Sequence, residues 1–500
     1  MADSWATSGS DLHLDLAVTS GPGARRPRAA LIAALRDAIR GGRLAPGTRL
    51  PSSRSLAADL GLARNTVAGA YSELVAEGWL SARHGSGTRV AQRTEPVPPR
   101  PARLPARGRA YAPGRDRGTT GTPHPRRPVV HDLRTGAPDV SAFPRSAWLA
   151  SARRALTAAP APAFSHGDLR GTAELRHALA GYLARARGVR ADPERIVVCA
   201  GFAQALTLLA RVVPGDIAVE EYGLFFHRET LEPHGTHTLP LPVDAHGART
   251  EALAGQARFA SVRTVLLTPA HQYPLGIPLH PDRRAAAVDW ARRRGGLVLE
   301  DDYDGEFRYD RHPVGALQGL DPERVVYLGT SSKALAPALR LAWMVLPGRL
   351  VDPVLAAKTP AEWTTGGLDQ LTLADFLERG AYDRHVRAMR QRYRARRDRL
   401  VERLAERVPG VRATGIAAGL HAVLRLPPGT DETATEAALR RAGIGLDTLS
   451  AYRHPAAPSA RPHPALVVGY GTPAEHAYAA AMDTLCDTLA TSLPGAPRPT

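Results

Sequence analysis

The stretch VVYLGTSSKALAPALRLAWMVLP, residues 325–347, decides the fold that we predict for most of this chain. It begins with a short apolar run, continues through a polar turn and ends in a second apolar run. Similar short runs occur upstream and alternate with helix-like segments, which is typical of an α/β sheet covered by helices. The predicted strands are RIVVCA (195–200), DIAVE (216–220), TVLLTP (264–269), GLVLEDD (296–302), RVVYLGT (324–330) and AWMVLP (342–347).

Length and composition limit the classes of protein to which the chain can belong. At 500 residues it is too long for one compact core, so two or three domains are expected. A hydrophobic content of 44% excludes a largely disordered chain. No apolar run approaches the roughly 18 residues of a membrane span, and the N-terminus lacks the pattern of a secretion signal. Two cysteines make neither a disulfide framework nor a zinc cluster. We therefore expect a soluble, cytoplasmic protein with no metal site and no membrane partner.

The pattern along the chain divides it into four segments. We predict an N-terminal extension over 1–27, a helical module over 28–90, a linker over 91–130 and a large region over 131–490. Within the large region, the α/β pattern runs to about 380, and a smaller α+β part follows over about 381–490.

Residues 28–90 have the pattern of three short helices followed by a β-hairpin wing. LIAALRDAIRGGRL (31–44) has apolar residues at helical spacing and a Gly-Gly stop. Two short helices are expected on either side of Gly61, and a tight hairpin is expected around 85–87. This arrangement suits the insertion of a helix into the DNA major groove, whereas the simpler alternative is a helical module with solvated arginines. The residues expected to contact double-stranded operator DNA are Arg49, Ser52, Arg54, Arg64, Asn65, Thr66 and Gly87.

Residues 91–128 are rich in arginine and proline and keep no amphipathic period, so we predict a semi-extended linker. Its arginines either touch DNA non-specifically or form a solvated tether, and we prefer the tether.

Lysine is conspicuously rare in this chain. Of 65 Lys and Arg residues, all but Lys333 and Lys358 are arginine. A primary amine can form a Schiff base with an aldehyde, whereas a guanidinium stays protonated. Lys333 follows a predicted buried strand, Thr330 and Ser332 precede it, and Arg340 follows. Because hydroxyls and an arginine fork can hold a phosphate, these residues suit pyridoxal 5′-phosphate (PLP), which is both an aldehyde and a phosphate. Lys358 is expected on the surface, and histidines outside the predicted site are expected to be solvated.

The segment LVLEDDYDGEF (297–307) supplies two further groups for such a cofactor. The carboxylate of Asp301 can keep a pyridine nitrogen protonated, and the phenol of Tyr303 can hydrogen-bond the ring oxygen. Taken singly, these residues have ordinary explanations, such as a surface lysine, a solvated strand end or a metal site. Together, on successive strand ends of an α/β sheet, they predict a PLP site.

Two parts of the sequence resemble known families. PGTRLPSSRSLAADLGLARNTVAGAYSELVAEGWLSARHGSGT (46–88) resembles the GntR-type winged helix-turn-helix. HGDLRGTAELRHALAGYLARARGV (166–189), TPAHQYPLG (268–276), EDDYDGEFRYD (300–310) and GTSSKALAPALR (329–340) resemble the fold-type I aminotransferase-like domain of MocR-type regulators. The order of module, linker and transferase-like domain is similar to the MocR/GabR family, including its PdxR-like members.

The resemblance implies roles for individual residues. Lys333 would carry PLP as a Schiff base, Asp301 would face the pyridine nitrogen, Tyr303 would face the ring hydroxyl, Arg340 with Thr330 or Ser332 would bind the phosphate, and His271 and Gln272 would lie in the loop beside the ring. Members of this family are typically domain-swapped, head-to-tail homodimers.

Three positions depart from the family pattern. At the helix that normally helps to hold phosphate, Phe202 and Ala203 can offer only backbone groups. Leu224 stands where a stacking tyrosine is usual, unless Tyr222 or Phe225 takes that place. Val467 stands where aminotransferases carry an arginine for the substrate carboxylate.

These features predict a PLP-dependent, DNA-binding transcriptional regulator that senses PLP or a small amino compound. The departure at Val467 favours PLP or an effector without a carboxylate. Two alternatives remain open: an active aminotransferase that also binds DNA, and a regulator whose PLP site has degenerated.

Overall fold

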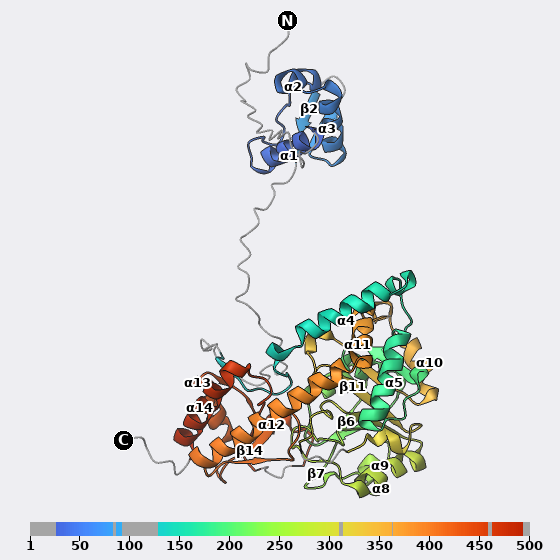
Figure 1. The fold of residues 1–500 in the computed structure, drawn as a ribbon, viewed down its shortest axis with the longest axis vertical. Helices are drawn as coiled ribbons and strands as arrows, with labels where there is room; N and C mark the ends of the chain where they lie inside the picture. Colours follow the sequence, from blue (N-terminus) through green and yellow to red (C-terminus); the bar gives the residue numbers. More distant parts are fainter. Residues whose placement is uncertain are drawn as a thin grey trace. The chain divides into compact units, whose positions relative to one another are not determined.

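The chain forms two compact units in the computed structural model, which describes residues 27–83, 87–92, 129–309, 314–362, 364–458 and 463–493 (Figure 1). The described residues of the first unit end at 92, and those of the second begin at 129. The predicted N-terminal extension up to residue 26, most of the predicted linker and the tip of the predicted wing lie outside the described residues, and Pro27, predicted as the end of the extension, is the first residue of a helix.

The first unit contains the three predicted helices and the two strands of the hairpin: α1 Pro27–Arg40, α2 Ser53–Leu60, α3 Arg64–Ala76, β1 Leu80–Arg83 and β2 Gly87–Val90. The two strands pair antiparallel, with Leu80 opposite Val90. Ser52 begins α2 as its cap, since its side chain accepts a hydrogen bond from the backbone of Ser55. A small apolar core in which Leu35, Val67 and Leu74 are fully buried holds the unit together.

A seven-stranded sheet forms the centre of the second unit, in the order β4-β12-β11-β10-β9-β5-β6. All strands run parallel except β12, which is antiparallel to both of its neighbours. The six strands predicted from the sequence are all present, and β6 was not predicted. The strands are β4 Ile196–Cys199, β5 Ile217–Glu220, β6 Thr238–Leu241, β9 Thr264–Leu267, β10 Leu297–Asp301, β11 Val325–Thr330 and β12 Ala342–Val345.

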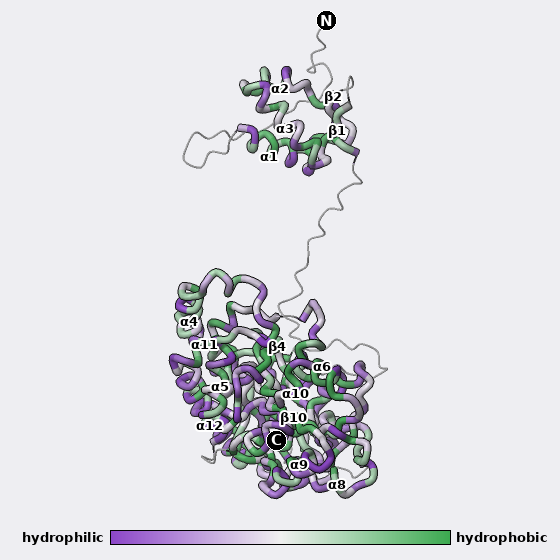
Figure 2. Tube along the Cα trace, turned by 90° about the vertical axis from the view of Figure 1, so that its right-hand side faces the viewer, coloured by the Kyte–Doolittle hydropathy of each residue, from purple (hydrophilic) through white to green (hydrophobic). Residues whose placement is uncertain are grey.

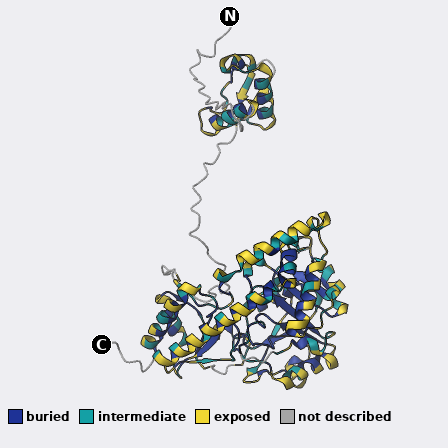
Figure 3. Cartoon of the chain, in the orientation of Figure 1, coloured by how far each residue is buried: buried dark blue, intermediate teal, exposed yellow. Residues whose placement is uncertain are grey.

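Helices cover both faces of this sheet, so alternate side chains of each strand enter two different cores. Val198 and Tyr327 pack with residues of α5 on one face, whereas Val197 and Leu328 pack with residues of α6 on the other. The sheet is therefore buried on both sides, as Figure 3 shows, and its strands are almost wholly apolar. Figure 2 shows the hydrophobic segments gathered in the interior of this unit, around β4 and β10. The helices of this part are α4 Arg145–Ala158, α5 Ala173–Arg187, α6 Phe202–Val212, α7 Phe225–Leu231, α8 Ala252–Gly255, α9 Pro281–Arg294, α10 Gly348–Ala356 and α11 Gly367–Glu378.

The long helix α12, Ala381–Arg407, leads into the smaller α+β part that the sequence predicted. Its antiparallel sheet has the order β13-β14-β17-β16, and a separate short strand, β3, pairs with β15. The strand that follows the linker is thus joined to a strand more than 300 residues later in the chain. The elements are β3 His131–Asp132, β13 Arg412–Thr414, β14 Ala422–Arg425, α13 Glu432–Arg441, β15 Ile444–Gly445, β16 Asp447–Thr448, β17 Ala465–Val468 and α14 Glu475–Ser492. None of the helices in the described part of the chain has the length and apolarity to span a membrane.

Candidate functional site

The predicted cofactor residues come together at one edge of the central sheet. Cys199, Ala342 and Thr330 lie side by side in the strand register, and Asp301 lies opposite Leu328 on the adjacent strand. The carboxyl ends of the parallel strands therefore share this edge, which is where α/β sheets commonly bind ligands.

Asp301 is the last residue of β10 and is only 3% exposed. Its Oδ1 atom has no hydrogen-bond partner among the described residues, and its Oδ2 atom lies 3.8 Å from Nε2 of His227. Burial, together with the neighbouring Asp302, raises the pKa of Asp301 well above its usual range. An unpaired buried carboxylate is costly, so this side chain is suited to a cationic N–H group of a ligand. His227 was not predicted as part of the site, because its proximity depends on how α7 packs.

Lys333 lies just after β11, and its Nζ atom donates a hydrogen bond to the carbonyl of Gly136. Burial lowers the pKa of the amine, and the charges of Asp301 and Asp304 partly offset this effect. A lowered pKa increases the fraction of neutral amine, which is the nucleophilic form. The structure thus places the predicted lysine just after β11 and the predicted aspartate at the end of the adjacent strand β10, and Lys333 is half-buried.

A second cluster forms the corner where a phosphate was predicted to bind. Arg340 donates a hydrogen bond to the carbonyl of Ala200, and a Cβ atom on Gly201 would lie 2.9 Å from the Arg340 guanidinium. Gly201 has φ of +96° and begins α6 without a side-chain cap, so backbone N–H groups of Phe202 and Ala203 lie at the helix start. Among the described residues, Arg340 is the one non-glycine residue whose backbone φ angle is positive, at +53°.

Thr330 lies next to this corner in the strand register, and Ser332 follows two residues later, just after β11. The hydroxyl of Thr330 donates to Oγ of Ser332 over 2.8 Å and accepts the backbone N–H of Ser332 over 3.1 Å. The one proton of Thr330 has a second acceptor in the Leu341 carbonyl, 3.3 Å away, so the hydroxyl of Ser332 can donate either to Thr330 or to a further acceptor. The predicted phosphate residues are therefore brought together, with the helix start as an additional anion-binding element.

Tyr303 is buried, and its hydroxyl lies 3.0 Å from Nδ1 of His271. The same His271 atom lies 2.9 Å from Oδ2 of Asp304. Gln272, predicted beside the ring, instead holds its own loop: its Nε2 donates to the carbonyls of Tyr222 and Tyr273, and its Oε1 accepts from the backbone of Leu275.

The three departures from the family pattern are visible in the structure. The ring of Phe202 packs 5.0 Å from that of His227, centroid to centroid. Leu224 borders a small cavity shared with Glu220 and His227, and Tyr222 is buried in a cluster with Tyr273 and Tyr303. Val467 is fully buried, opposite Val423 and Asp447 in the smaller sheet. A guanidinium is thus absent from position 467, and the side chain there belongs to the core.

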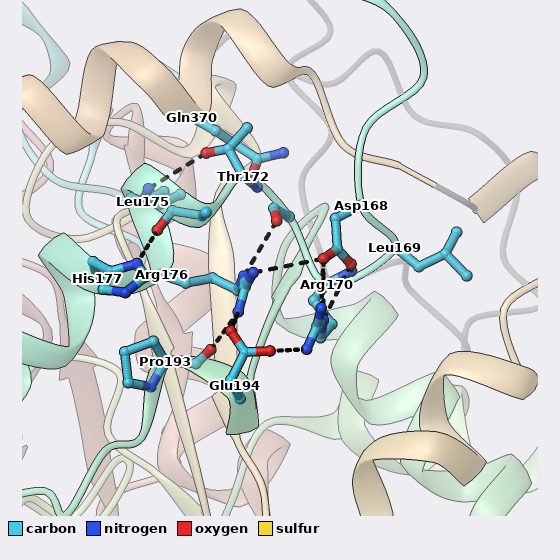
Figure 4. Close-up of polar contacts among 12 residues, drawn as sticks. Asp168, Leu169, Arg170, Thr172, Leu175, Arg176, His177, Pro193, Glu194 and Gln370 are labelled. Carbon is cyan, nitrogen blue, oxygen red and sulfur yellow. Dashed lines mark hydrogen bonds and ion pairs between the residues drawn. The ribbon is translucent and has the colours of Figure 1, made fainter. Parts of the chain in front are cut away.

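The segment 166–176, part of one of the motifs quoted above, is fixed by charged groups (Figure 4). Arg170 pairs with Asp168 over 2.7 Å, Arg176 pairs with Glu194 over 2.7 Å, and Arg170 also contacts Glu194. The backbone N–H of Val198 in β4 donates to the Arg170 carbonyl over 2.7 Å. The network therefore ties this loop to the strand that leads to Gly201 and α6.

Two sequence predictions about isolated side chains were wrong. Lys358 is buried, not on the surface, and its Nζ donates to the carbonyl of Leu169. His227, His421 and His454 are buried, not solvated, because helix packing and the smaller sheet cover them. No group of His, Cys, Asp or Glu side chains suited to a metal ion was found in the described ranges.

In the first unit, the predicted DNA-contacting residues lie around α2, α3 and the wing. Arg49, Arg54, Arg64, Asn65 and Gly87 are exposed. Arg64 is the first residue of α3, and the cap residue Ala63 offers no side-chain hydrogen bond, so the first backbone N–H groups of α3 lack a side-chain cap.

Ser52 and Arg49 have additional roles within the fold. The hydroxyl oxygen of Ser52 caps α2, which still leaves its proton free to donate. The side chain of Arg49 lies beside Gly87 of the wing. The backbone of Arg49 also forms an isolated antiparallel β-bridge with that of Arg89. The hydroxyl of Tyr71 in α3 donates to the Pro51 carbonyl over 3.0 Å, which fixes α3 against the start of α2.

Comparisons with known protein families match both units. Residues 27–90 match the model of the bacterial regulatory proteins of the gntR family, and residues 129–459 match that of the class I and II aminotransferases. The second match implies PLP as cofactor. The unpaired Oδ1 of Asp301 at the sheet edge that also carries Lys333, and the hydroxyls with Arg340 at the helix start, fit the pyridine and phosphate ends of that molecule.

Solved structures support the fold of the second unit. The kynurenine aminotransferase of Pyrococcus horikoshii is 25% identical, with a TM-score of 0.65 over 72% of this chain and 91% of that one. The multiple substrate aminotransferase of Thermococcus profundus is 26% identical with the same TM-score and coverage.

Two relatives that match most of this chain carry names of regulators. The pyridoxine biosynthesis regulator PdxR of Corynebacterium glutamicum is 33% identical over 84% of this chain and 87% of its own length. The probable rhizopine catabolism regulator MocR of Rhizobium meliloti is 37% identical over 72% of this chain and 74% of its own length. The chain therefore belongs to the MocR family of HTH-type transcriptional regulators, in which a gntR-type winged helix is joined to a class I and II aminotransferase domain.

Proposed function

We propose that this protein is a transcriptional regulator whose first unit binds operator DNA and whose second unit holds PLP on Lys333 and senses a small molecule there. The observation that carries the proposal is that Lys333, just after β11, and the partnerless carboxylate oxygen of Asp301, at the end of the adjacent β10, share one sheet edge, in a chain that also has an exposed helix start at Arg64. The DNA that it would regulate lies in the cytoplasm, which is where we expect it to act.

Each residue of the sheet edge has a defined task in this proposal. Lys333 would hold the cofactor through its aldehyde carbon, and Asp301 would accept a hydrogen bond from the protonated pyridine nitrogen. Arg340, with Ser332 and the start of α6, would bind the phosphate. When bound, PLP supplies an electron sink for amino compounds attached to its aldehyde carbon.

The residue at position 467 supports a proposal about the chemical class of the small molecule. Val467 is fully buried, and neither it nor its cross-strand neighbour Val423 can pair with a carboxylate. A site built to bind a carboxylate loses much of its discrimination without the charged partner. We infer that the effector is PLP itself or an amino compound without a carboxylate, which agrees with the name of the relative PdxR.

The regulator is proposed to act as a homodimer. Helix α4 buries Ser151 alone, whereas Leu149 on it is 67% exposed and Phe164 nearby in sequence is 58% exposed. Exposed large apolar side chains of this kind are typical of an interface. A dimer would also present two copies of α3, as half-sites of an operator require.

The deciding experiment combines a cofactor titration with DNA binding. Purified wild-type protein and the Lys333→Ala variant are titrated with PLP, followed by absorbance, by trapping with borohydride and by mass spectrometry. The proposal predicts a trapped adduct on residue 333 that is absent from the variant. It also predicts that PLP or an amine changes operator affinity, and that operator DNA changes the affinity for that ligand by the same factor.

An active aminotransferase is the second candidate, and the presence of both Lys333 and Asp301 at one sheet edge favours it. It predicts sustained turnover with an amino donor and an oxo acid. If the protein carries out only single half-reactions or no turnover, and a ligand changes its DNA binding, the aminotransferase hypothesis is excluded and the regulator hypothesis stands. Failure of wild-type protein to bind PLP would instead indicate a degenerated site.

A further inference from the structure

A buried cluster lies just after the end of β10 and is formed by Tyr303, Asp304 and His271. Their side chains are at most 8% exposed. The Nδ1 atom of His271 lies 2.9 Å from Oδ2 of Asp304 and 3.0 Å from the hydroxyl oxygen of Tyr303. These are the hydrogen bonds of the Asp304 carboxylate and of the Tyr303 hydroxyl within the described part of the chain.

The direction of each hydrogen bond follows from the donors and acceptors available. A carboxylate can only accept, so the proton between Asp304 and His271 must be on Nδ1. A protonated Nδ1 cannot accept, so the hydroxyl oxygen of Tyr303 must be the second acceptor of that N–H group. The hydroxyl proton of Tyr303 is then left without a protein acceptor among the described residues, which leaves it for an acceptor atom of a ligand.

The imidazole of His271 fits in this position because residue 419 is a glycine and has no side chain. Gly419 has φ of +72°, and a Cβ atom there would lie 2.3 Å from Cε1 of His271 and 2.6 Å from Oδ2 of Asp304. Any larger residue at 419 would push the imidazole away from the carboxylate. The ring of His421 also packs against that of His271, with 5.3 Å between the ring centroids.

We propose that Asp304 is a positioning residue that acts through His271 to aim the hydroxyl proton of Tyr303 at the ring oxygen of the cofactor. The inference rests on the proposed function, since it needs PLP at Lys333. In this arrangement Tyr303 would be the group that touches the cofactor, whereas Asp304 would select the tautomer of His271 and thereby the direction of the Tyr303 hydroxyl. Charged or titratable groups that face this cluster from neighbouring elements are Lys333, Asp301, Glu220, Tyr273 and His421.

The first test uses the pH at which the absorbance band of the Lys333-bound cofactor changes. A hydrogen bond to the ring oxygen makes that oxygen less basic, so the neighbouring N–H proton is lost at lower pH. Loss of the bond in Tyr303→Phe or Asp304→Asn is therefore expected to raise the transition by about one pH unit, the size of one charge-assisted hydrogen bond. His246→Asn, at an exposed position, is the control and is expected to keep the wild-type transition.

A double-mutant cycle separates positioning from direct electrostatics. If Asp304 acts through Tyr303, Asp304→Asn produces its shift in the wild-type background and no further shift in Tyr303→Phe. If its charge acts directly on Lys333, the same shift persists in both backgrounds, and the proposal is overturned. If the Asp304→Asn variant does not fold, His271→Gln replaces it in the double-mutant cycle.

A second readout needs no cofactor. In ¹⁵N-histidine-labelled protein, His271, assigned with the His271→Gln variant, is expected to be protonated at Nδ1, and Asp304→Asn is expected to shift it towards the other tautomer. A wild-type His271 without a proton on Nδ1 overturns the inference. Absence of any PLP adduct with the expected tautomer present would instead count against the proposed function.

Discussion

His227 Nε2 and Asp301 Oδ2 lie 3.8 Å apart in the interior, just beyond hydrogen-bond distance, and each side chain keeps a buried polar atom without a partner. Burial lowers the pKa of His227 to about 3, so the imidazole is neutral at neutral pH and does not neutralise the carboxylate. Asp301 therefore remains an acceptor for an external N–H group.

This relationship predicts the effect of Asp301→Asn. The amide removes the charge that keeps the pyridine nitrogen protonated, so PLP affinity should fall about tenfold or more, as expected for loss of a charge-assisted hydrogen bond. Equilibrium titration by absorbance or fluorescence measures the change. Asp352→Asn, at an exposed position in α10, should leave the affinity unchanged. Wild-type affinity in Asp301→Asn would show that the carboxylate does not face the cofactor.

A substitution of Arg340 is predicted to lower the affinity for PLP through the phosphate end of the cofactor. Its left-handed backbone, at φ of +53°, costs about 1–2 kcal/mol, a strain that the fold retains where the guanidinium meets Gly201. Arg340→Ala should weaken PLP binding about tenfold, and the affinity for pyridoxal, which lacks the phosphate, should change little. Arg249→Ala is the charge-matched control, since this exposed arginine pairs only with Glu251 among the described residues. Equal losses for PLP and pyridoxal would contradict a phosphate-binding role.

The exposed apolar side chains on and near α4 predict the effect of a charge at the proposed interface. Leu149→Asp and Phe164→Asp should convert a dimer into a monomer over micromolar concentrations, because a charge buried without a partner strongly opposes association. Analytical ultracentrifugation measures the change. Leu320→Asp, at another exposed apolar position, should leave the dimer intact. A monomeric wild-type protein would refute this proposal.

The helix start at Arg64 predicts two kinds of DNA effect. Arg64→Ala should weaken binding to all sequences, by about tenfold at low salt, and lower the salt slope by about one if Arg64 neutralises a phosphate. Asn65→Ala should mainly reduce the ratio of specific to non-specific affinity, because amide side chains read adenine edges. Fluorescence anisotropy at several salt concentrations separates the two, with Arg249→Ala as control. An unchanged salt slope in Arg64→Ala would exclude the phosphate contact.

The sequence was sufficient to predict residues whose position follows from one strand end. Lys333, Asp301 and Tyr303 each follow a short apolar run, and the carboxyl ends of parallel strands meet at one edge. Arg340 and the hydroxyls of Thr330 and Ser332 were predicted differently, from the groups that can hold a phosphate and from the family resemblance. No local pattern could have shown that the Lys333 amine contacts the carbonyl of Gly136, almost 200 residues earlier.

The missed residues depend on packing between distant elements. His227 reaches Asp301 only because α7 packs over the sheet edge, and Asp304 needs the loop of His271 to become part of the cluster. Lys358 was expected to be exposed because charged residues seldom lie in the interior, yet a carbonyl from the loop before α5 accepts its hydrogen bond.

Glu220 predicts how stability depends on pH. Burial raises its pKa to about 7 from an ordinary 4.5, with hydrogen bonds from Thr268 and Gln272 opposing the shift. The folded protein thus holds this proton more tightly than the unfolded chain does. The stability that Glu220 contributes is full below about pH 4.5 and is lost as the pH rises through 7. Glu300 and Glu306, also raised to about 7, act in the same direction.

The Glu220→Gln variant should therefore lose less stability than the wild type between pH 5 and pH 8. The expected difference is on the order of 1–3 kcal/mol, measured as the change in thermal unfolding midpoint of the second unit at the two pH values. His227 and His421, whose pKa values burial lowers to about 3, lose their contribution as the pH falls below 6.5, so they leave the upper part of this range unaffected. Glu232→Gln, at an exposed position, should follow the wild-type curve. Parallel curves for the wild type and Glu220→Gln would mean that Glu220 is ionised in the folded protein at pH 5, contrary to its burial beneath the site.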